Sequence, residues 1–549
     1  ITVTVTFNEP MASGPRITIG SAVNNVALTA TSSTTWTYAW STSGVSAGSY
    51  TVTVTGTDLA GNTYAGSDKI TITLDSTAPT VTLSDTDDDN LLAASDTVTI
   101  IAAFSEGMTA TPTISISGTS ISNQEMSKIW AQVGADIDGE AAGDESGRGE
   151  NSLSFSSDGS RLAIGGYLND GNGTSSGHVR IYDYNGSAWV QVGADIDGEA
   201  ANDASGWSVS LSSDGSRVAI GAYTNDGGGT NSGHVRIYQY NNNSWSQLGA
   251  DINGEAALDI SGYSVSLSSD GSRVAIGAMG NDGNGSDSGH VRIYQYNNNS
   301  WSQLGADIDG EAANDNSGIS ISLSSDGSRV AIGAYRNDGN GSDSGHVRIY
   351  QYNNNSWSQL GADIDGEAAG DYSGYSVSLS SDGSRVAIGA GGNDGNGSNS
   401  GHVRIYDYNG SAWVQVGADI DGEAADDGSG YSISLSSDGS RVAIGAGGND
   451  GGGTNFGHVR IYQYNNNSWS QLGADIDGEA VQDQSGRSIY LSSDGKRVAI
   501  GAPFNDGNGS NSGHVRVYSI SSGGSYQYAW DVDSGGAPSD GTYRATVAG

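Results

Sequence analysis

The seven histidines of this chain are evenly spaced, and this regularity constrains the fold more than any other feature of the sequence. They lie 56 residues apart from His178 to His514, so a unit of fixed length repeats without insertion. The tryptophans keep the same interval up to Trp469, whereas Trp130 lies 59 residues before Trp189, because the first copy has three extra residues. The chain therefore contains seven copies of one structural unit.

Each copy contains four short segments that are rich in Val, Ile or Tyr or alternate between apolar and polar residues, with Gly, Asn and Asp between them. Such segments predict strands, and Asp270-Gly271 indicates a tight hairpin turn between the first two. No helix fits into the unit. Small sheets that are apolar on both faces need a neighbour on either side, which is typical of radial blades. The sequence predicts an all-β fold with a seven-bladed β-propeller over residues 127–520.

The two ends of the array predict how the ring closes. After Tyr518 the last copy lacks the Trp-x-Gln strand that ends the other copies, yet an unpaired Trp130-Ala-Gln-Val-Gly134 precedes the first copy. We expect residues 129–134 to form the outer strand of the last blade, beside residues 515–520. This arrangement removes an exposed sheet edge.

The segments on either side of the array form a second repeat. Phe7-Asn-Glu-Pro-Met11 recurs as Phe104-Ser-Glu-Gly-Met108, but the counterpart of Tyr38-Ala-Trp40 appears only beyond the array, at Tyr528-Ala-Trp530. The second copy is thus interrupted by a propeller inserted at a surface loop, where insertions are tolerated. The predicted domains are one sandwich over 1–78, the first part of a second sandwich over 79–126, the propeller over 127–520, and the remainder of the second sandwich over 521–549.

The charge of the chain excludes some classes of partner. Lys plus Arg total 22 against 62 for Asp plus Glu, and a formal charge of −40 repels nucleic acid and anionic lipids alike. There is no Cys, and no run of about 18 apolar residues that could enter a membrane. The chain starts at Ile1 without a visible secretory signal, so we take it as a piece of a longer protein.

Two family resemblances follow from these residues. The flanks, with Gly56-Thr-Asp-Leu-Ala-Gly-Asn62 and Asp75-Ser-Thr-Ala-Pro79, resemble the tandem bacterial immunoglobulin-like domains of large secreted adhesins. The array is similar to FG-GAP repeats, as in the integrin α-subunit propeller: Ser-Gly-Tyr263-Ser-Val matches the first half of that motif, and Gly501-Ala-Pro503 matches the second. The resemblance implies a secreted or cell-surface bacterial protein.

The carboxylates suggest a calcium site, though not the one of the family. FG-GAP propellers often carry an Asp-x-Asp-x-Asp-Gly loop between their first two strands, whereas the connection here, Ser-Ser-Asp-Gly, is too short to wrap a cation. The repeated Asp-Ile-Asp-Gly-Glu-Ala-Ala-x-Asp, here called the acidic motif, supplies four carboxylates within nine residues, which suits Ca²⁺. The alternative is that these aspartates cap turns. The candidate ligands are Asp136, Asp138, Asp144, Asp195, Asp197, Asp203, Asp307, Asp309, Asp315, Asp363, Asp365, Asp371, Asp419, Asp421, Asp427, Asp475, Asp477 and Asp483.

The other repeated polar and aromatic residues favour structural roles. The histidines lie on different radii of a wheel and cannot converge, so each is expected to be buried between blades or bonded to a turn. Arg292 and its equivalents are expected to pair with loop carboxylates, and Trp301 and its equivalents to pack between blades.

Positions that vary among the seven copies are the better candidates for ligand binding. They follow the Ser-Gly and Gly-Ala pairs, at strand ends where propellers place their loops, and exposed aromatics there can stack on sugars or grip a protein. Drift at positions that the fold does not constrain is the alternative. The candidate ligand-binding residues are Trp207, Tyr223, Tyr263, Tyr335, Arg336, Tyr375, Tyr431 and Phe504.

The sequence favours an extracellular adhesin whose propeller loops contact a cell-surface glycan or protein. The alternative is a structural subunit of a fibre, with the loops packed against identical subunits. An enzyme is not expected, because catalysis needs one unique constellation, whereas every histidine here belongs to a sevenfold repeated frame.

Overall fold

The computed structural model describes residues 1–12, 14–64, 69–75, 78–85, 97–105, 111–116, 121–149, 151–520, 524–531 and 545–548. These residues form strands and contain no helix, so none that could cross a membrane. The all-β prediction is therefore confirmed. The chain divides into two compact units, one of Ile1–Thr82 with Phe104–Glu106 and one of Leu83–Ala103 with Gly107–Gly549.

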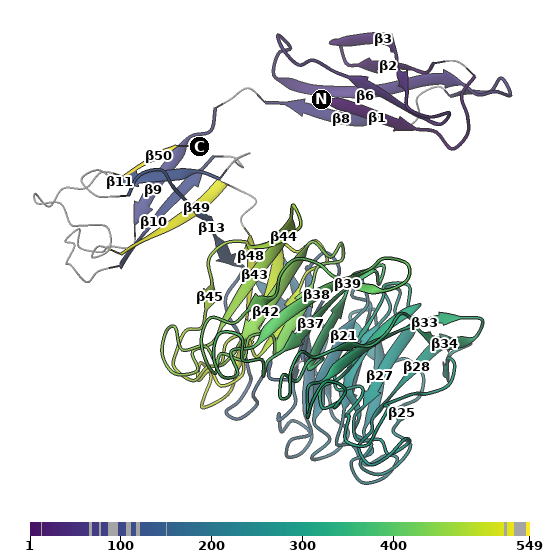
Figure 1. Ribbon diagram of the computed structural model, residues 1–549, viewed down its shortest axis with the longest axis vertical. Helices are drawn as coiled ribbons and strands as arrows, with labels where there is room; N and C mark the ends of the chain where they lie inside the picture. Colours follow the sequence, from purple (N-terminus) through teal and green to yellow (C-terminus); the bar gives the residue numbers. More distant parts are fainter. Residues whose placement is uncertain are drawn as a thin grey trace, which may run out of the picture. The chain divides into compact units, whose positions relative to one another are not determined.

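The first unit consists of two antiparallel sheets around one apolar core (Figure 1). Val3, Ile17, Ile19 and Trp40 are buried in that core. The alternating Thr-Val and Thr-Ile sequences bury one side chain in two, as expected for strands with one face on a core. One sheet has the order β1 (Thr2–Thr6), β5 (Thr35–Ala39), β4 (Thr29–Ala30), and the other β3 (Val23–Ala27), β2 (Arg16–Ile19), β6 (Gly48–Thr57), β7 (Thr63–Tyr64), with β8 (Ile70–Leu74) beside β6.

In the second unit, strands from before and after the repeat array share two sheets. Ser127 and Lys128 of β13 pair with β49, and β11 pairs with β50 over four residues. The counterpart of Met11 at Met108 lies outside the described residues. The strands are β13 (Ser127–Lys128), β49 (Gly524–Asp531), β10 (Thr97–Phe104) and β9 (Val81–Asp85) in one sheet, and β12 (Gln124–Glu125), β11 (Thr113–Ile116) and β50 (Ala545–Ala548) in the other.

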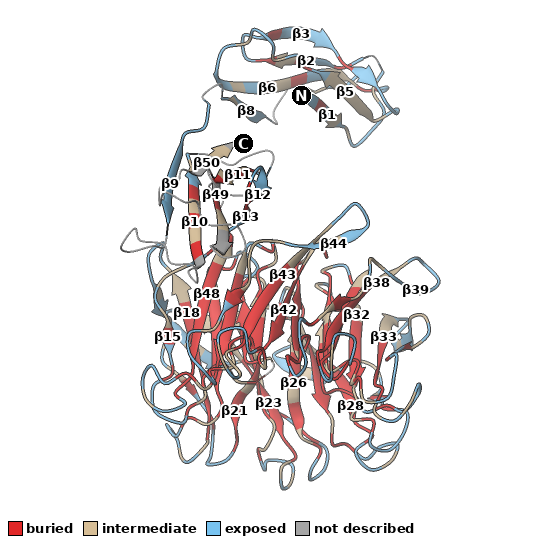
Figure 2. Ribbon diagram, turned by 60° about the vertical axis from the view of Figure 1, so that its left-hand side comes forward, coloured by how far each residue is buried: buried red, intermediate tan, exposed pale blue. Residues whose placement is uncertain are grey.

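The array itself forms four-stranded antiparallel sheets that resemble propeller blades, each with a short fifth strand beside its third. Within the described part of residues 130–520 there are seven such sheets, one per repeat. The figures show them side by side, and Figure 2 shows many buried residues on their strands (Figures 1 and 2). In chain order the strands are β16 (Leu153–Phe155), β17 (Arg161–Gly166), β18 (His178–Tyr184), β19 (Trp189–Gln191) and β20 (Ile196–Asp197); β21 (Ser205–Leu211), β22 (Arg217–Ala222), β23 (His234–Asn241), β24 (Ser244–Gln247) and β25 (Ile252–Asn253); β26 (Ser261–Leu267), β27 (Arg273–Ala278), β28 (His290–Asn297), β29 (Ser300–Gln303) and β30 (Ile308–Asp309); β31 (Ile321–Leu323), β32 (Arg329–Ala334), β33 (His346–Asn353), β34 (Ser356–Gln359) and β35 (Ile364–Asp365); β36 (Ser376–Leu379), β37 (Arg385–Ala390), β38 (His402–Tyr408), β39 (Trp413–Gln415) and β40 (Ile420–Asp421); β41 (Ser432–Leu435), β42 (Arg441–Ala446), β43 (His458–Asn465), β44 (Ser468–Gln471) and β45 (Ile476–Asp477); and β46 (Ser488–Leu491), β47 (Arg497–Ala502) and β48 (His514–Ile520), completed by β14 (Trp130–Gln132) and β15 (Ile137–Asp138).

Neighbouring sheets are joined by apolar clusters and one repeated hydrogen bond. Val179 and Ile181 of one sheet pack against Val218 and Ile220 of the next. Burial of each such side chain contributes about 1.5–3 kcal/mol. A tryptophan at the same place in each repeat also donates from its indole Nε1 to a carbonyl of the preceding sheet, for example Trp357 to Leu304 O at 2.7 Å.

A steric constraint explains the glycine of each Val-Ala-Ile-Gly-Ala strand. A Cβ atom on Gly333 would lie 1.9 Å from the carbonyl oxygen of Gly374 in the next sheet, so two backbones meet here with no room for a side chain. Close backbone approach between sheets thus explains the fixed Gly in this strand.

The last sheet is completed from the front of the array, as the sequence predicts. Trp130 pairs with Ile520 and Gln132 with Tyr518, and Trp130 Nε1 donates to Leu472 O at 2.7 Å, as its equivalents do elsewhere. On its other face this sheet packs against Phe155 of the first sheet. The contacts between consecutive sheets therefore also link the last sheet to the first.

Candidate functional site

The strand register defines two ends for every sheet. The third strand begins at its histidine, which pairs with the last residue of the second strand, as His234 does with Ala222. It ends beside the outer strand, where Tyr240 pairs with Trp245. We call these the histidine end and the tryptophan end. The chain enters and leaves the array at the tryptophan end, at Trp130 and Ile520.

The first group of candidate residues forms one aromatic cluster at the histidine end. The ring centroid of Trp207 lies 5.0 Å from that of Tyr223 and 5.3 Å from that of Tyr263, and Tyr223 lies 5.7 Å from Tyr263. Tyr167 joins them, 4.9 Å from Trp207 in an edge-to-face arrangement. Such geometries are the favourable ones for aromatic pairs. Burial raises the pKa of Tyr223, so its hydroxyl stays protonated and can donate.

A second aromatic cluster lies at the same end of other sheets. Tyr375 is 5.4 Å from Tyr335 and 4.9 Å from Tyr431, and Tyr372 lies 5.9 Å from Tyr335. Arg336 is exposed and its guanidinium lies 5.1 Å from the ring of Tyr335. The sequence candidates therefore come together in two groups.

Arginines extend both clusters. The guanidinium of Arg148 lies 5.1 Å from the Phe504 ring and 5.9 Å from the Tyr167 ring, and that of Arg487 lies 5.7 Å from Tyr431. These separations are within the range of cation–π attraction. Together the two clusters form what we call the aromatic row: Phe504, Arg148, Tyr167, Trp207, Tyr223, Tyr263, Tyr335, Tyr372, Tyr375, Tyr431 and Arg487.

Four members of the aromatic row were not among the sequence candidates. Arg487 stands at the Trp207 position of the last copy, and the other three are Tyr167, Arg148 and Tyr372. Tyr167 occupies in the first copy the place that Tyr223 has in the second, and Arg148 occupies the place of Trp207. Tyr372 stands just before Ser-Gly, at a third position that varies among the copies, and its backbone has a φ of 56°. A comparison of all seven copies, with the position before Ser-Gly included, would have identified Tyr167, Arg148 and Tyr372.

The third aspartates of the acidic motif are turn caps. Asp144 is 3% exposed, and its Oδ2 accepts hydrogen bonds from the backbone N–H of Ala141 at 2.9 Å and from Asn169 Nδ2 at 3.1 Å. The Asn equivalent to Asn169 bonds the capping Asp in other copies too, as Asn337 does with Asp315. Backbone N–H groups bond this aspartate in most copies, which corresponds to the turn-capping alternative for Asp144, Asp203, Asp315, Asp371 and Asp427, while Asp483 accepts a hydrogen bond from Asn505 Nδ2.

The second aspartates face a different loop. The Oδ1 atom of Asp197 lies beside Gly171, in the Asn-Asp-Gly loop between the second and third strands of a sheet. The Oδ1 atom of Asp138 lies beside Gly507 in the equivalent loop of the last sheet. Burial and the nearby Asp136 carboxylate raise the pKa of Asp138. Asp138, Asp197, Asp309, Asp365, Asp421 and Asp477 occupy this position.

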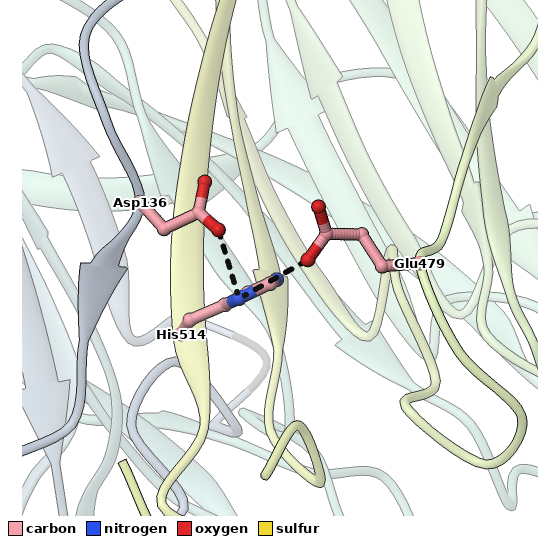
Figure 3. Close-up of side chains that lie close together, drawn as sticks. All are labelled: Asp136, Glu479 and His514. Atoms are coloured by element: carbon pink, nitrogen blue, oxygen red, sulfur yellow. Dashed lines mark ion pairs between the residues drawn. The ribbon is translucent and has the colours of Figure 1, made fainter. Parts of the chain in front are cut away.

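The first aspartates and the glutamates of the acidic motif approach the histidines instead. In Figure 3 the Asp136 and Glu479 side chains point toward His514 from opposite sides; their oxygens lie 3.8 and 3.9 Å from its Nδ1. Asp136, Asp195, Asp307, Asp363, Asp419 and Asp475 occupy this first position. The four carboxylates of one motif therefore go to different places, and calcium binding at a single motif stays a prediction.

The calcium loop of FG-GAP propellers has no counterpart between the first and second strands. Asp158, which holds that place in the first sheet, accepts hydrogen bonds from Ser156 Oγ at 2.8 Å and from the backbone N–H of Ser160 at 2.9 Å. Its carboxylate stabilises the hairpin turn, and these hydrogen bonds lower its pKa against the opposing effect of burial. The residues present do not fit that metal site.

The arginines follow the sequence expectation. Arg292 Nη1 lies 3.4 Å from Glu255 Oε1, and its Nη2 donates to the backbone carbonyl of Asn253 at 2.8 Å. The same pair of contacts recurs in other copies, for example at Arg348 with Glu311. The arginine thus holds the glutamate of the acidic motif beside the third strand, on which the arginine itself lies.

Three segments of the chain, residues 195–238, 307–350 and 363–406, match the FG-GAP repeat. The chain contains FG-GAP repeats. Each matched segment runs from the first aspartate of the acidic motif to the tyrosine of the third strand. No match to a curated protein was found.

The solved structures that match the chain share little sequence with it. A protein assigned as a 6-phosphogluconolactonase from Bacteroides uniformis has a TM-score of 0.43 at 13% identity and covers 62% of this chain and 88% of its own. The phage phi92 endosialidase has a TM-score of 0.35 at 10% identity, covering 73% and 70%. A tetra-tandem repeat from the extending region of a large adhesion protein has a TM-score of 0.12 at 14% identity, covering 87% and 95%. At these TM-scores the likenesses support no functional assignment.

Proposed function

We propose that this chain is an extracellular adhesion module of a large bacterial surface protein, and that it binds a glycan or protein ligand through the aromatic row. In this proposal a seven-bladed β-propeller is inserted into an immunoglobulin-like sandwich. The pairing of β11 with β50 and of β13 with β49, across the whole array, supports the insertion. The hydrogen bonds of Trp130 and the packing of Phe155 against the last sheet support a closed ring.

The aromatic row carries the proposal. Trp207, Tyr263, Tyr375 and Tyr431 are all partly exposed and come from equivalent positions of four sheets. Large, stiff aromatic side chains bury much area at low entropic cost, and they dominate the energetics of many interfaces. The chain enters and leaves the array at the other end of the sheets, so the connections to the flanking strands start from the opposite end.

The charge of the chain narrows the ligand class. A formal charge of −40 disfavours an anionic ligand, while ring faces bind the apolar faces of sugars without needing a charge. A neutral oligosaccharide is therefore the first ligand to test. The aromatic row includes no acid–base pair specific to one sheet, and we propose no catalytic role.

The test is binding of the full chain to immobilised neutral oligosaccharides, with Trp207→Ala and Tyr375→Ala as variants. Truncation of a central aromatic contact costs about 2 kcal/mol, so each variant is expected to bind about thirtyfold more weakly. Tyr296→Ala at the tryptophan end is the matched control and is expected to bind like the parent. Equal binding of all three variants would contradict the proposal. Self-association that is lost in Trp207→Ala would instead support the fibre-subunit alternative.

A further inference from the structure

Each histidine of the array meets carboxylates from two successive acidic motifs. His178, at the start of β18, has its Nδ1 atom 3.6 Å from Glu140 Oε2 of one motif and 3.8 Å from Asp195 Oδ2 of the next. One ligand atom from each of the three residues lies within 4.8 Å of the others, and seven such groups occur in the described chain. Examples are Glu199–His234–Asp251, Glu255–His290–Asp307, Glu311–His346–Asp363 and the group of Figure 3, Asp136–Glu479–His514.

In the first repeat the imidazole lacks a hydrogen-bond partner on the side that faces the carboxylates. The His178 side chain is 1% exposed, and its Nδ1 is buried without a hydrogen-bond partner among the described residues. The two N···O separations of 3.6 and 3.8 Å exceed hydrogen-bond length. A buried polar atom left unpaired costs about 1–3 kcal/mol. In other copies the buried ring nitrogen without a hydrogen-bond partner among the described residues is Nε2, at His290, His346, His402, His458 and His514.

The protonation state of the imidazole indicates what fits between these atoms. An imidazole with its ordinary pKa of about 6.5 is neutral near pH 7 and carries its single proton on one of its two ring nitrogens. With that proton on Nε2, the Nδ1 lone pair and two carboxylate oxygens face the same small space. Three acceptors converging on one point call for a cation.

We propose that the space between His178, Glu140 and Asp195, and its equivalents around the array, binds a divalent transition-metal ion such as Zn²⁺. Imidazole nitrogen with carboxylate oxygens is a ligand set of Zn²⁺, whereas Ca²⁺ takes oxygen ligands. Metal–ligand bonds of about 2.0–2.2 Å place tetrahedral ligands roughly 3.4 Å apart, a few tenths of an ångström less than the separations seen here. A small movement of the carboxylates closes the site.

The surroundings suit an ion that enters from solvent. Glu140 is 42% exposed, which leaves an open side where water completes the coordination. Arg180 Nη1 lies 3.8 Å from the other oxygen of Glu140 and so holds Oε2 toward the imidazole. Because each ion contacts the acidic motifs of two repeats, binding joins neighbouring sheets at the histidine end and stabilises the ring by mass action.

The test measures zinc bound to the full chain by equilibrium dialysis after removal of metal with a chelator. The parent is expected to bind up to seven equivalents at micromolar free zinc, and its melting temperature rises with zinc relative to EDTA. The variant Glu199→Gln with Glu311→Gln removes one ligand from each of two sites at partly exposed positions, and it is expected to lose two equivalents. His234→Asn with His346→Asn repeats this loss from the imidazole side.

A control variant carries Asp343→Asn and Asp426→Asn on neighbouring loops and is expected to keep the full stoichiometry with the same change in net charge. X-ray absorption at the zinc edge is expected to show one imidazole nitrogen per ion. No zinc binding, the same stoichiometry in all variants, or calcium binding in place of zinc would each overturn the proposal.

Discussion

Replacing Trp130 by Ala tests the closure of the ring. The Trp130 side chain is 7% exposed, packs with Tyr518 and Ile520 of β48, and donates through Nε1 to Leu472 O. Loss of a buried Trp side chain costs about 3–5 kcal/mol, of which the hydrogen bond accounts for about 1 kcal/mol. We expect Trp130→Ala to lower the free energy of unfolding by that amount, although Trp130 lies more than three hundred residues from Leu472 in the sequence.

The matched variant is Trp357→Ala in the middle of the array. Trp357 also donates to a carbonyl of the preceding sheet, Leu304 O, at the same 2.7 Å distance, but its own sheet is built from one continuous stretch of chain. Urea unfolding of the full chain, followed by fluorescence and by hydrogen exchange of the last sheet, compares the two. Similar losses mean that β14 is an integral strand. A loss of 3–5 kcal/mol for Trp357→Ala with less than about 1 kcal/mol for Trp130→Ala would refute the closure.

Two further predictions concern stability. Leu258 has a φ of 70° and is 58% exposed, and the equivalent residues in two other copies are asparagines. Leu258→Asn is therefore expected to raise the free energy of unfolding by about 0.5–1 kcal/mol in urea titrations, and Asn202→Leu is expected to lower it. In EDTA, stability is expected to be complete above about pH 6.5 and to fall toward pH 4. The reason is that burial lowers the pKa of His178, His234 and His514 to about 4 in the fold, whereas it is about 6.5 in the unfolded chain. The unfolded chain therefore binds more protons between these two pH values. A urea midpoint that stays constant from pH 7 to pH 4 would contradict this prediction.

The fold of the array was largely predictable because its signals are local. Alternating Val and Ile residues, with Asp-Gly turns between them, specify each strand, and the missing outer strand after Tyr518 indicated that Trp130 supplies it. The aromatic row was partly predictable for a related reason. Where a framework repeats, positions that vary, such as Trp207, stand out from it. Tyr372 was missed because its column precedes the Ser-Gly pair.

The destination of the acidic side chains depended on geometry that spacing does not reveal. Four carboxylates within nine residues suggested one calcium loop, but left-handed residues such as Ala204, with a φ of 54°, turn the loop so that Asp203 meets the backbone N–H of Ala200. The histidines were correctly expected to be kept apart from one another. Their approach to Glu and Asp from two repeats follows from how consecutive sheets stack, so the sequence of a single repeat does not contain it.

The proposed function places ligand binding at the histidine end of the array, through the aromatic row. Incorporation of fluorotryptophan gives each of the 11 tryptophans its own ¹⁹F resonance, and Trp207→Phe assigns the one in the aromatic row. Seven others, such as Trp357, hydrogen-bond between sheets at the tryptophan end and serve as internal references. On titration with an oligosaccharide that the chain binds, the Trp207 resonance is predicted to shift while the seven references stay fixed. Shifts of the references with no change at Trp207 would contradict the account.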